Sequence, residues 1–403
     1  MKISIVNSVY QMGSTGNMAK TLTDFFEGQG HDVCAFYGRK GNSSDRRTIK
    51  VDSAFEVGFH MAASLLTGLQ GHYSKKATAK LIGKLGEFSP DIVILLNVHG
   101  YYLNENSLFE YLGDADIPVL NIMPDEYPFL GKCCFSFDCT KYETKCFSCP
   151  QTRMYPLSLF LDRSTKIFEE KRVRYSRCKR LAFAGPQYSL EKARRSALLS
   201  DQKLYCLDWG IDVEDQYKPI SMKQARQALG LPLDKRKFLT IGSFSDRRKG
   251  IKEYYYPCAQ ALNDMDALFV HVGYTEKKTG LPENYLALPY ISNQDELVKY
   301  YCAADCVVLP SLQDTMPYAA LIALACGVPI CCFNTSGMAY LADQTCCYYV
   351  EEISVAALQE QLALIPARDT EKSKVCRNYA ERRYSSYRFC STVEDICRDI
   401  LER

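Results

Sequence analysis

The sequence predicts an α/β protein with two parallel sheets. Short apolar runs typical of buried strands alternate with helical stretches along most of the chain, an order that favours parallel sheets covered by helices. The clearest unit lies around Ser311–Ile330: CVVLP at 306–310 predicts one strand, PICCF at 329–333 predicts the next, and the stretch between them predicts a crossover helix. The length of 403 residues allows two or three domains.

Two series of strands divide the chain. The first series is predicted at 2–9, 32–38, 89–100, 117–125 and 180–186, and the second at 237–244, 267–274, 286–292, 306–310 and 329–333. The two series meet near residues 205–220. We therefore expect an N-terminal domain at 1–205, a C-terminal domain at 206–380, and a helical tail at 381–403 that packs back on the N-terminal domain.

The helix after the strand at 306–310 shows where a ligand would bind. Residues 318–326 carry no charge and no helix breaker, which predicts burial on all sides. Thr315 or Asp314 is expected to cap this helix, with Pro317 in its first turn. The amides of Thr315 and Met316 would then face an anion above the carboxyl end of a strand. An ordinary capped crossover helix explains the same residues without a ligand.

Composition narrows the class of protein. A net charge of +2 argues against nucleic acid as the main partner. No apolar run reaches the roughly 18 residues expected of a membrane span, and the N-terminus MKISIVNSVYQMG lacks the features of a signal peptide. We expect a cytoplasmic protein. Its 19 cysteines, an odd number, then indicate free thiols or a metal site instead of a disulfide framework.

One loop concentrates cysteine. CCFSFDCTKYETKCFSCP at 133–150 holds five cysteines, and Cys146 and Cys149 form a CxxC knuckle. Cys139, with Cys133 or Cys134, would complete a tetrahedral thiolate site for one structural zinc. Small buried hydrophobic side chains are the alternative, since the chain uses cysteine freely. An iron–sulfur cluster is less favoured because no redox motif accompanies the loop.

Two further segments have residues typical of phosphate-binding loops. GSTGNMAK at 13–20 opens a helix after the first strand, and its glycines Gly13 and Gly16 would allow close approach to a phosphate or sugar; a plain turn explains them equally well. IGSFSDRRKG at 241–250 brings Arg248 and Lys249 to the end of a strand, where cations suit a diphosphate. A solvated charge run is the alternative.

Other polar features have structural explanations of equal or greater weight. His99 ends a predicted strand, a position where a lone histidine is more often structural than functional. The stretch 163–180 carries eight Lys or Arg residues, and 74–84 carries four lysines. These are either solvated helix faces or basic patches for peripheral contact with an anionic membrane.

Taken together, these motifs resemble the retaining family-four glycosyltransferases of the GT-B fold, in which two Rossmann-like domains face each other across a cleft. The likeness is strongest to enzymes of bacterial capsule and exopolysaccharide assembly. It rests on NVHGYYLN at 97–104, FSFDCTKYETKCFSCPQ at 135–151, DWGIDVEDQYKP at 208–219, IGSFSDRRKG at 241–250 and LPSLQDTMPYAALIALACGVPI at 309–330. Matched to the cysteine loop of these enzymes, the four cysteine positions are Cys133, Cys139, Cys146 and Cys149.

The resemblance implies site residues, and the chain departs from the family at two of them. The family's acidic donor motif has two glutamates eight positions apart. Asp314 takes the place of the first, which contacts the donor sugar, and Ile322 takes the place of the second, which binds the ribose. An aliphatic side chain can pack but cannot accept a hydrogen bond. Pro124 stands where the family has a histidine, and Asp125 follows it.

The implied function is transfer of a hexose from a UDP- or GDP-sugar to a lipid-linked glycan, with retention at the anomeric carbon and without a catalytic metal. The implied catalytic group is Asp314, Asp125 and His99. The implied donor-binding set is Gly13, Gly16, Arg248, Lys249, Thr315, Met316 and Ile322. A non-catalytic relative that binds nucleotide or glycan, or that partners an active transferase, is the first alternative. A nucleotide-sugar epimerase of the same fold is the least favoured.

Overall fold

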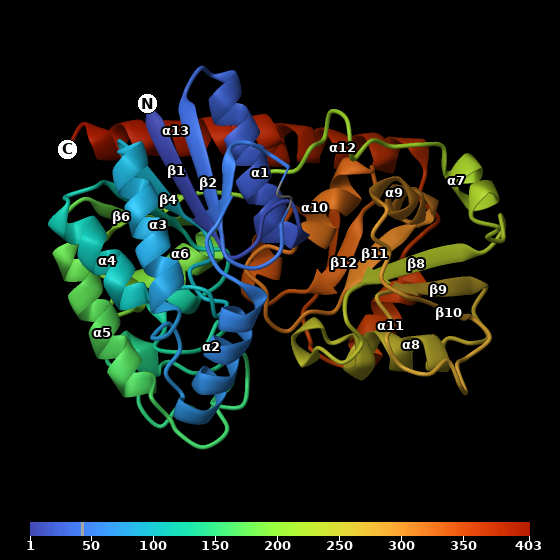
Figure 1. Ribbon diagram of the computed structural model, residues 1–403. Helices are drawn as coiled ribbons and strands as arrows, with labels where there is room; N and C mark the ends of the chain where they lie inside the picture. The colour runs from blue at the N-terminus through green and yellow to red at the C-terminus, as the bar shows by residue number, and fades with distance from the viewer. Residues whose placement is uncertain (42–43) are drawn as a thin grey trace. The chain divides into compact units, whose positions relative to one another are not determined.

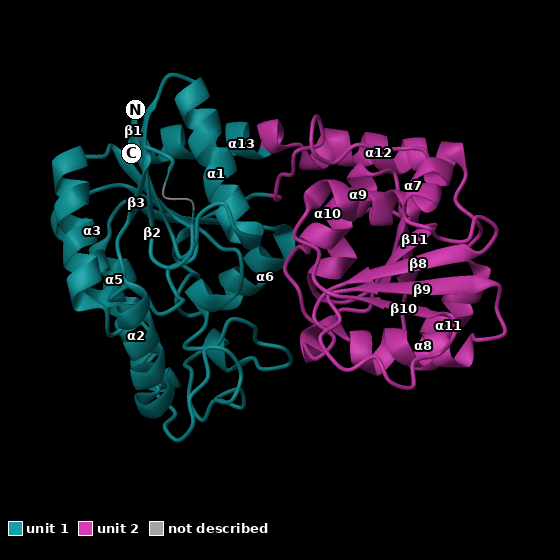
Figure 2. Ribbon diagram, turned by 45° about the vertical axis from the view of Figure 1, so that its right-hand side comes forward, with its two compact units in different colours: residues 1–207, 389–403 teal, residues 208–388 magenta. Residues whose placement is uncertain are grey.

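A computed structural model describes residues 1–41 and 44–403 and divides them into two compact units (Figures 1 and 2). Unit 1 comprises Met1–Leu207 with Phe389–Arg403, and unit 2 comprises Asp208–Arg388. Each unit contains one parallel sheet with helices on its faces. The expected two Rossmann-like parallel-sheet domains are thereby confirmed.

The sheet of unit 1 has the strand order β3-β2-β1-β4-β5-β6-β7, and every neighbouring pair is parallel. Its strands are β1 (Lys2–Asn7), β2 (Asp32–Tyr37), β3 (Thr48–Lys50), β4 (Ile92–Leu95), β5 (Val119–Ile122), β6 (Leu181–Gly185) and β7 (Lys203–Cys206). Its helices are α1 (Gly13–Gly28), α2 (Ala54–Thr67), α3 (Lys75–Phe88), α4 (Glu105–Asp114), α5 (Ser164–Arg177) and α6 (Gln187–Arg195). Every residue of β4 is apolar and buried, and the buried residues of β1 are apolar except Ser4 and Asn7. These two strands therefore lie in the core of the unit.

The sheet of unit 2 has the order β10-β9-β8-β11-β12-β13, again parallel throughout. Its strands are β8 (Arg236–Ile241), β9 (Ala267–Val272), β10 (Tyr285–Leu288), β11 (Cys306–Leu309), β12 (Ile330–Phe333) and β13 (Cys347–Val350). Its helices are α7 (Met222–Ala228), α8 (Tyr256–Ala261), α9 (Gln294–Ala303), α10 (Tyr318–Ala325), α11 (Val355–Leu364) and α12 (Thr370–Tyr384).

The last helix, α13 (Ser386–Leu401), contacts the first unit along most of its length. Glu394 Oε1 lies 3.1 Å from His31 Nε2, and Cys390 Sγ lies 3.8 Å from the carbonyl oxygen of Thr21. The chain therefore returns to unit 1 at Phe389, whereas the expected tail began at 381.

Helix α10 is the buried crossover predicted between β11 and β12, but its N-terminus differs from the expectation. The N-cap is Pro317, in extended conformation, and no side chain caps the helix. The expected cap by Thr315 or Asp314 is wrong because both residues precede the N-cap position, and the Asp314 carboxylate contacts Lys249 instead. Strand β4 also ends earlier than predicted, at Leu95, so His99 lies in the loop that follows.

Candidate functional site

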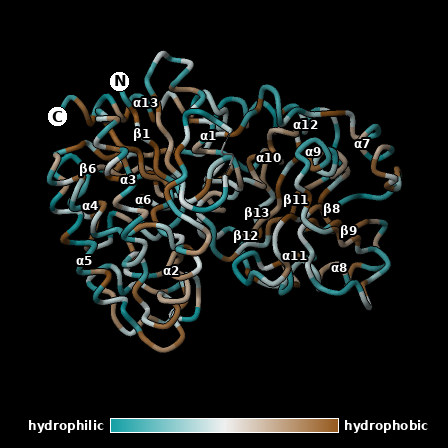
Figure 3. Tube along the Cα trace, viewed as in Figure 1, coloured by the Kyte–Doolittle hydropathy of each residue, from teal (hydrophilic) through white to brown (hydrophobic). Residues whose placement is uncertain are grey.

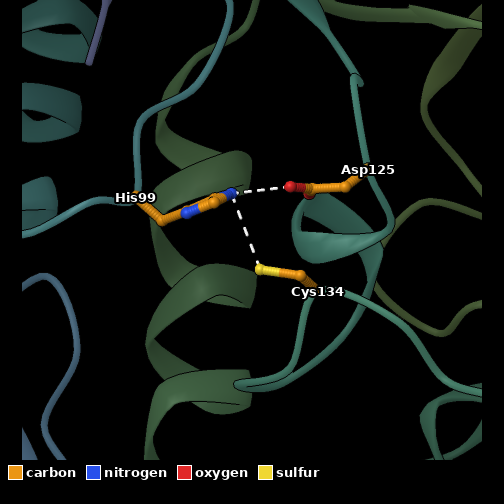
Figure 4. Close-up of side chains that lie close together, drawn as sticks. All are labelled: His99, Asp125 and Cys134. Carbon is orange, nitrogen blue, oxygen red and sulfur yellow. Dashed lines mark hydrogen bonds and ion pairs between the residues drawn. The ribbon is translucent and has the colours of Figure 1, made fainter. Parts of the chain in front are cut away.

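In unit 1, a histidine and an aspartate from two neighbouring strand ends meet (Figure 4). His99 follows β4 and Asp125 follows β5, and these strands are parallel neighbours, so both side chains reach the carboxyl edge of the sheet. His99 Nε2 lies 2.7 Å from Asp125 Oδ2. Pro124 cannot supply the imidazole expected from the resemblance, and the structure instead brings His99 to the aspartate.

The neighbours of this pair fix its orientation. The backbone amide of Tyr127 donates to Asp125 Oδ1 at 2.9 Å, and the hydroxyl of Tyr155 lies 3.2 Å from His99 Nδ1. Burial opposes ionisation of the Asp125 carboxyl, but the charge and hydrogen bond of His99 outweigh it, and the pKa of Asp125 lies below its usual value. The Asp125 carboxylate therefore stays ionised at neutral pH and accepts a hydrogen bond from the imidazole.

Cys134 is a third member of this cluster that the sequence did not single out for it. Its Sγ lies 3.6 Å from His99 Nε2. Within the described residues, these three side chains form the sole group of three or more His, Cys, Asp or Glu whose ligand atoms all lie within 4.8 Å of one another. Nothing in the sequence distinguished Cys134 from Cys133. The Cys134 thiol reaches His99 only because of the way the loop folds.

The glycine segment of unit 1 lies at the adjacent strand end. Helix α1 begins at Gly13 itself, which has a φ of +62°. A Cβ at Gly16 would lie 3.2 Å from Gln11 N and 3.2 Å from Val9 Cγ2, so the loop after β1 packs tightly against the first helical turn. This close packing, with the amide of Gln11 donating to the Gly16 carbonyl at 2.9 Å, accounts for one glycine without any ligand.

In unit 2, the structure brings a predicted donor-binding residue, Lys249, into contact with a predicted catalytic residue, Asp314. Lys249 Nζ lies 2.6 Å from Asp314 Oδ2, although the residues are 65 positions apart. Lys249 follows β8 and Asp314 follows β11, which are parallel neighbours. The Lys249 side chain is 24% exposed and the Asp314 side chain is 12% exposed, so a ligand can reach the pair. Arg248 contacts Asp246, with Nη2 of the guanidinium 2.6 Å from Oδ2 of the carboxylate.

Backbone contacts hold this pair in place. The Arg248 carbonyl accepts from the amide of Leu312 at 2.7 Å, which ties the basic turn to the acidic segment. The amide of Gly337 donates to the Asp314 carbonyl at 2.9 Å. A Cβ at Gly337 would lie 1.9 Å from the Thr315 carbonyl oxygen, so only glycine fits there. Sequence reasoning missed Gly337, although a glycine shortly after a buried parallel strand was a usable signal.

The remaining predicted donor residues are buried around α10. Thr315 and Met316 are each 3% exposed, and Ile322 is 7% exposed. Met316 Sδ accepts from the amide of Trp209 at 3.3 Å. Both Thr315 and Met316 precede the helix and its N-cap residue, Pro317, so their amides lie before its first turn. The Ile322 side chain presents no acceptor at the position where the family has a carboxylate.

The four predicted zinc ligands line one small cavity, but they are not gathered into a finished site. Cys133, Cys139, Cys146 and Cys149 all border it, together with Lys132 and Ser164. The hydrogen bond from Cys133 lowers the pKa of Cys149 to about 7, whereas burial raises the pKa of Cys146 to about 11. The zinc assignment stays a prediction.

In the described part of the chain, no helix combines the length and the apolar character needed to cross a bilayer.

Sequence comparison places part of the chain beside known glycosyltransferases. Residues 235–365 match the family model described as Glycosyl transferases group 1. The chain is 31% identical over 140 residues to a protein named as a teichuronic acid biosynthesis glycosyltransferase, TuaC, of Bacillus subtilis (strain 168). That match covers 35% of this chain and 35% of the relative, so the chain aligns with about a third of the curated protein's length.

Solved structures share the fold over nearly the whole chain. Sucrose-phosphate synthase from Thermosynechococcus elongatus superposes with a TM-score of 0.68 at 15% identity, covering 100% of this chain and 99% of that one. WaaG, a glycosyltransferase of lipopolysaccharide biosynthesis, gives 0.65 at 16% identity, covering 98% and 99%. Anabaena Alr3699/HepE in complex with UDP gives 0.67 at 14% identity, covering 99% and 100%. At these identities the likeness establishes the fold.

Proposed function

We propose that this protein is a retaining hexosyltransferase that moves a sugar from a nucleotide diphosphate donor to a lipid-linked glycan during surface polysaccharide synthesis. The observation that carries the proposal is the contact of Lys249 with Asp314 at the carboxyl edge of a parallel sheet. It lies within the segment that matches Glycosyl transferases group 1. The structural relatives crystallised with UDP and with UDP-glucose support a nucleotide-sugar donor.

In this proposal, unit 2 binds the donor. Lys249 and Arg248 neutralise the diphosphate as it leaves, and Asp314 holds hydroxyls of the donor sugar. The bond between the anomeric carbon and the diphosphate oxygen breaks, a bond from the acceptor oxygen forms on the same face, and the acceptor proton passes to the leaving diphosphate. The products are a nucleoside diphosphate and the extended glycan. No catalytic metal is needed for this step.

Unit 1 would present the acceptor. His99, oriented by Asp125 on one ring nitrogen and Tyr155 on the other, offers a polar contact at the end of β4. Gly13 and Gly16 would allow the backbone after β1 to approach a bound phosphate or sugar closely. Such a transferase would work at the cytoplasmic face of the membrane, where the basic stretches 74–84 and 163–180 support peripheral contact.

A second candidate function is a non-catalytic relative that binds nucleotide or glycan, or that partners an active transferase. Two residues favour it: Ile322 cannot accept a hydrogen bond from a ribose, and Pro124 cannot replace a histidine. A nucleotide-binding relative and a transferase would both bind the donor, and only the transferase predicts turnover.

Donor hydrolysis without an acceptor separates these candidates. Purified protein is incubated with a panel of UDP- and GDP-hexoses, and the released sugar is followed by NMR at times shorter than its mutarotation. We expect release within that time of the sugar with the anomeric configuration of the donor, and a lower rate in Asp314→Asn. The control Asp343→Asn changes an exposed acid of unit 2 outside the site. Release of the opposite anomer contradicts retention, and no release from any donor favours the non-catalytic candidate.

We also propose that the cysteine loop holds one structural zinc. The fit is partial in the structure: all four sulfurs border one cavity, and the thiols of Cys133 and Cys149 share a hydrogen bond. Tetrahedral zinc with bonds of about 2.3 Å would draw the sulfurs to roughly 3.8 Å from one another. Elemental analysis of protein purified without added metal is expected to find about one zinc per chain. Cys149→Ser should lose it and exposed Cys206→Ser should keep it; zinc-free native protein contradicts the assignment.

A further inference from the structure

Helix α2 exposes the side chains that a helix of a globular protein normally buries. Phe55, Phe59 and Leu66 are 84%, 60% and 54% exposed, and with Ala62 they recur at helical spacing along one face. The buried positions are instead His60 and Ser64. The outward face of α2 is thus a largely exposed apolar stripe, and the Tyr73 ring lies against one member, Phe59, with the ring centroids 6.2 Å apart.

A loop beside α2 extends the stripe. Residues 154–161 expose Met154, Tyr155, Leu157, Leu159, Phe160 and Leu161. The loop is joined to the helix, because the amide of Leu159 donates to the Leu65 carbonyl at 2.9 Å and a Cβ at Gly68 would lie 2.3 Å from the Leu161 carbonyl oxygen. Figure 3 shows apolar colouring along this part of unit 1, and Figure 2 shows α2 beside the neighbouring loops.

These two segments form what we term the apolar face: residues 54–67 and 154–161. They hold ten of the nineteen exposed large apolar side chains found in the described part of the chain. Isolated exposed hydrophobic residues are ordinary, whereas a contiguous set on one side of a domain marks an interaction surface. This clustering of exposed apolar side chains therefore indicates that another molecule binds the apolar face.

The charges around the apolar face indicate what covers it. Arg153 and Arg163 flank the loop, and exposed Lys75 and Lys76 follow Ser74, whose hydroxyl contacts His60 at 2.9 Å. No ion pair within residues 1–41 and 44–403 engages any of these four cations.

Two acidic side chains, Glu56 and Asp162, adjoin the apolar face. Glu56 is the only charged side chain on α2, and it lies in the first helical turn. Asp162 accepts backbone amides on both oxygens, from Cys149 at 2.7 Å and from Ser164 at 2.8 Å. An apolar stripe rimmed by unpaired cations is the pattern of a surface that lies in the headgroup region of an anionic bilayer.

We propose that the apolar face inserts into an anionic lipid bilayer, with the aromatic and leucine side chains among the acyl chains and the four cations on the headgroups. A protein partner would need a matching apolar surface and acidic rim, whereas anionic lipid supplies both. The face also borders the candidate site, since Tyr155 belongs to it and its hydroxyl lies 3.2 Å from His99 Nδ1. This last point rests on the proposed function: a bilayer there would bring a lipid-linked acceptor to His99.

Vesicle binding tests the apolar part of the proposal without donor or acceptor. The full chain is sedimented with vesicles of phosphatidylglycerol and, in parallel, of phosphatidylcholine. We expect binding to phosphatidylglycerol, and at least a tenfold loss of affinity in Phe59→Ser/Phe160→Ser. The matched control Tyr290→Ser/Leu364→Ser alters two side chains that are 74% and 77% exposed on unit 2 and should bind as the native protein does.

The contribution of the four cations beside the apolar face is tested by removing charge alone. Arg153→Gln/Arg163→Gln should bind phosphatidylglycerol at least tenfold more weakly and lose much of the salt dependence, whereas Lys223→Gln/Lys235→Gln on unit 2 should not. Equal affinity of the Phe59/Phe160 variant and the native protein overturns the proposal. A native dimer that the Phe59/Phe160 variant converts to a monomer, without vesicle binding, would assign the face to a second copy instead. Failure here leaves donor binding by unit 2 untouched, so it is distinguishable from failure of the proposed function.

Discussion

Two apolar helices of this protein have opposite surroundings. In α10 every residue from Ala320 to Ala325 is buried, whereas in α2 only His60 and Ser64 are. The cause is topological: α10 is the sole helix between β11 and β12, but α2 shares the connection from β3 to β4 with α3. Helix α3 packs Leu81 and Leu85 into the core, which leaves α2 outside. Apolar composition alone therefore does not indicate burial.

The largest expected effect comes from shortening one leucine in each helix, which tests this contrast in burial. Leu324 is fully buried in α10, and Leu66 is 54% exposed in α2. Leu324→Ala should lower the free energy of unfolding by about 2–5 kcal/mol, because it removes buried methyl groups and leaves a cavity. Leu66→Ala should change it by less than about 0.5 kcal/mol. Denaturant unfolding of both variants measures the difference, and equal losses would contradict the contrast.

The second test uses the buried polar side of α2. Burial lowers the pKa of His60 to about 4, below the value of roughly 6.5 in an unfolded chain. The unfolded state then binds the proton more strongly, so the stability is present above pH 6.5 and is lost as the pH falls toward 4. The full effect is about 3 kcal/mol.

The variant His60→Asn isolates that contribution. Unfolding free energies are measured at pH 7 and pH 4.5 for both proteins, and the native protein should lose more stability on acidification than the variant. If the unfolding free energies of the two proteins depend equally on pH, His60 is solvated and the polar side of α2 is not buried.

The smallest expected effect compares a carboxylate placed on each helix. Ile322→Glu on α10 restores an acceptor for ribose hydroxyls, worth about 1.5–3 kcal/mol of donor affinity as a charged hydrogen bond. Met61→Glu on exposed α2 should change neither donor affinity nor melting temperature. Calorimetry and thermal melting measure both variants. Lost stability in Ile322→Glu, with no donor binding before or after the change, would favour the non-catalytic candidate.

The sequence predicted the two parallel sheets because their strands are short apolar runs separated by clear helical stretches. It also predicted that Arg248, Lys249 and Asp314 follow strand ends. The direct contact of Lys249 with Asp314 depends on β8 and β11 being neighbours, an order that no local pattern encodes.

Other features were missed for similar reasons. The role of Gly337 depends on its close approach to the Thr315 carbonyl oxygen, and the place of Cys134 beside His99 depends on how the cysteine loop folds back. The exposure of α2 could not be read from its composition, because its apolar residues fit a buried helix equally well.

Donor binding tests the central claim most directly. Calorimetric titration of the full chain with UDP-, GDP-, ADP- and dTDP-sugars is expected to find one class of donor that binds. Arg248→Ala/Lys249→Ala should weaken that binding by roughly 2–4 kcal/mol, since each charged hydrogen bond contributes about 1.5–3 kcal/mol and the two are not additive. Arg153→Gln/Arg163→Gln, on the other unit, should bind the donor as the native protein does. Unchanged affinity in the Arg248/Lys249 variant, or no binding of any nucleotide sugar, would contradict the account.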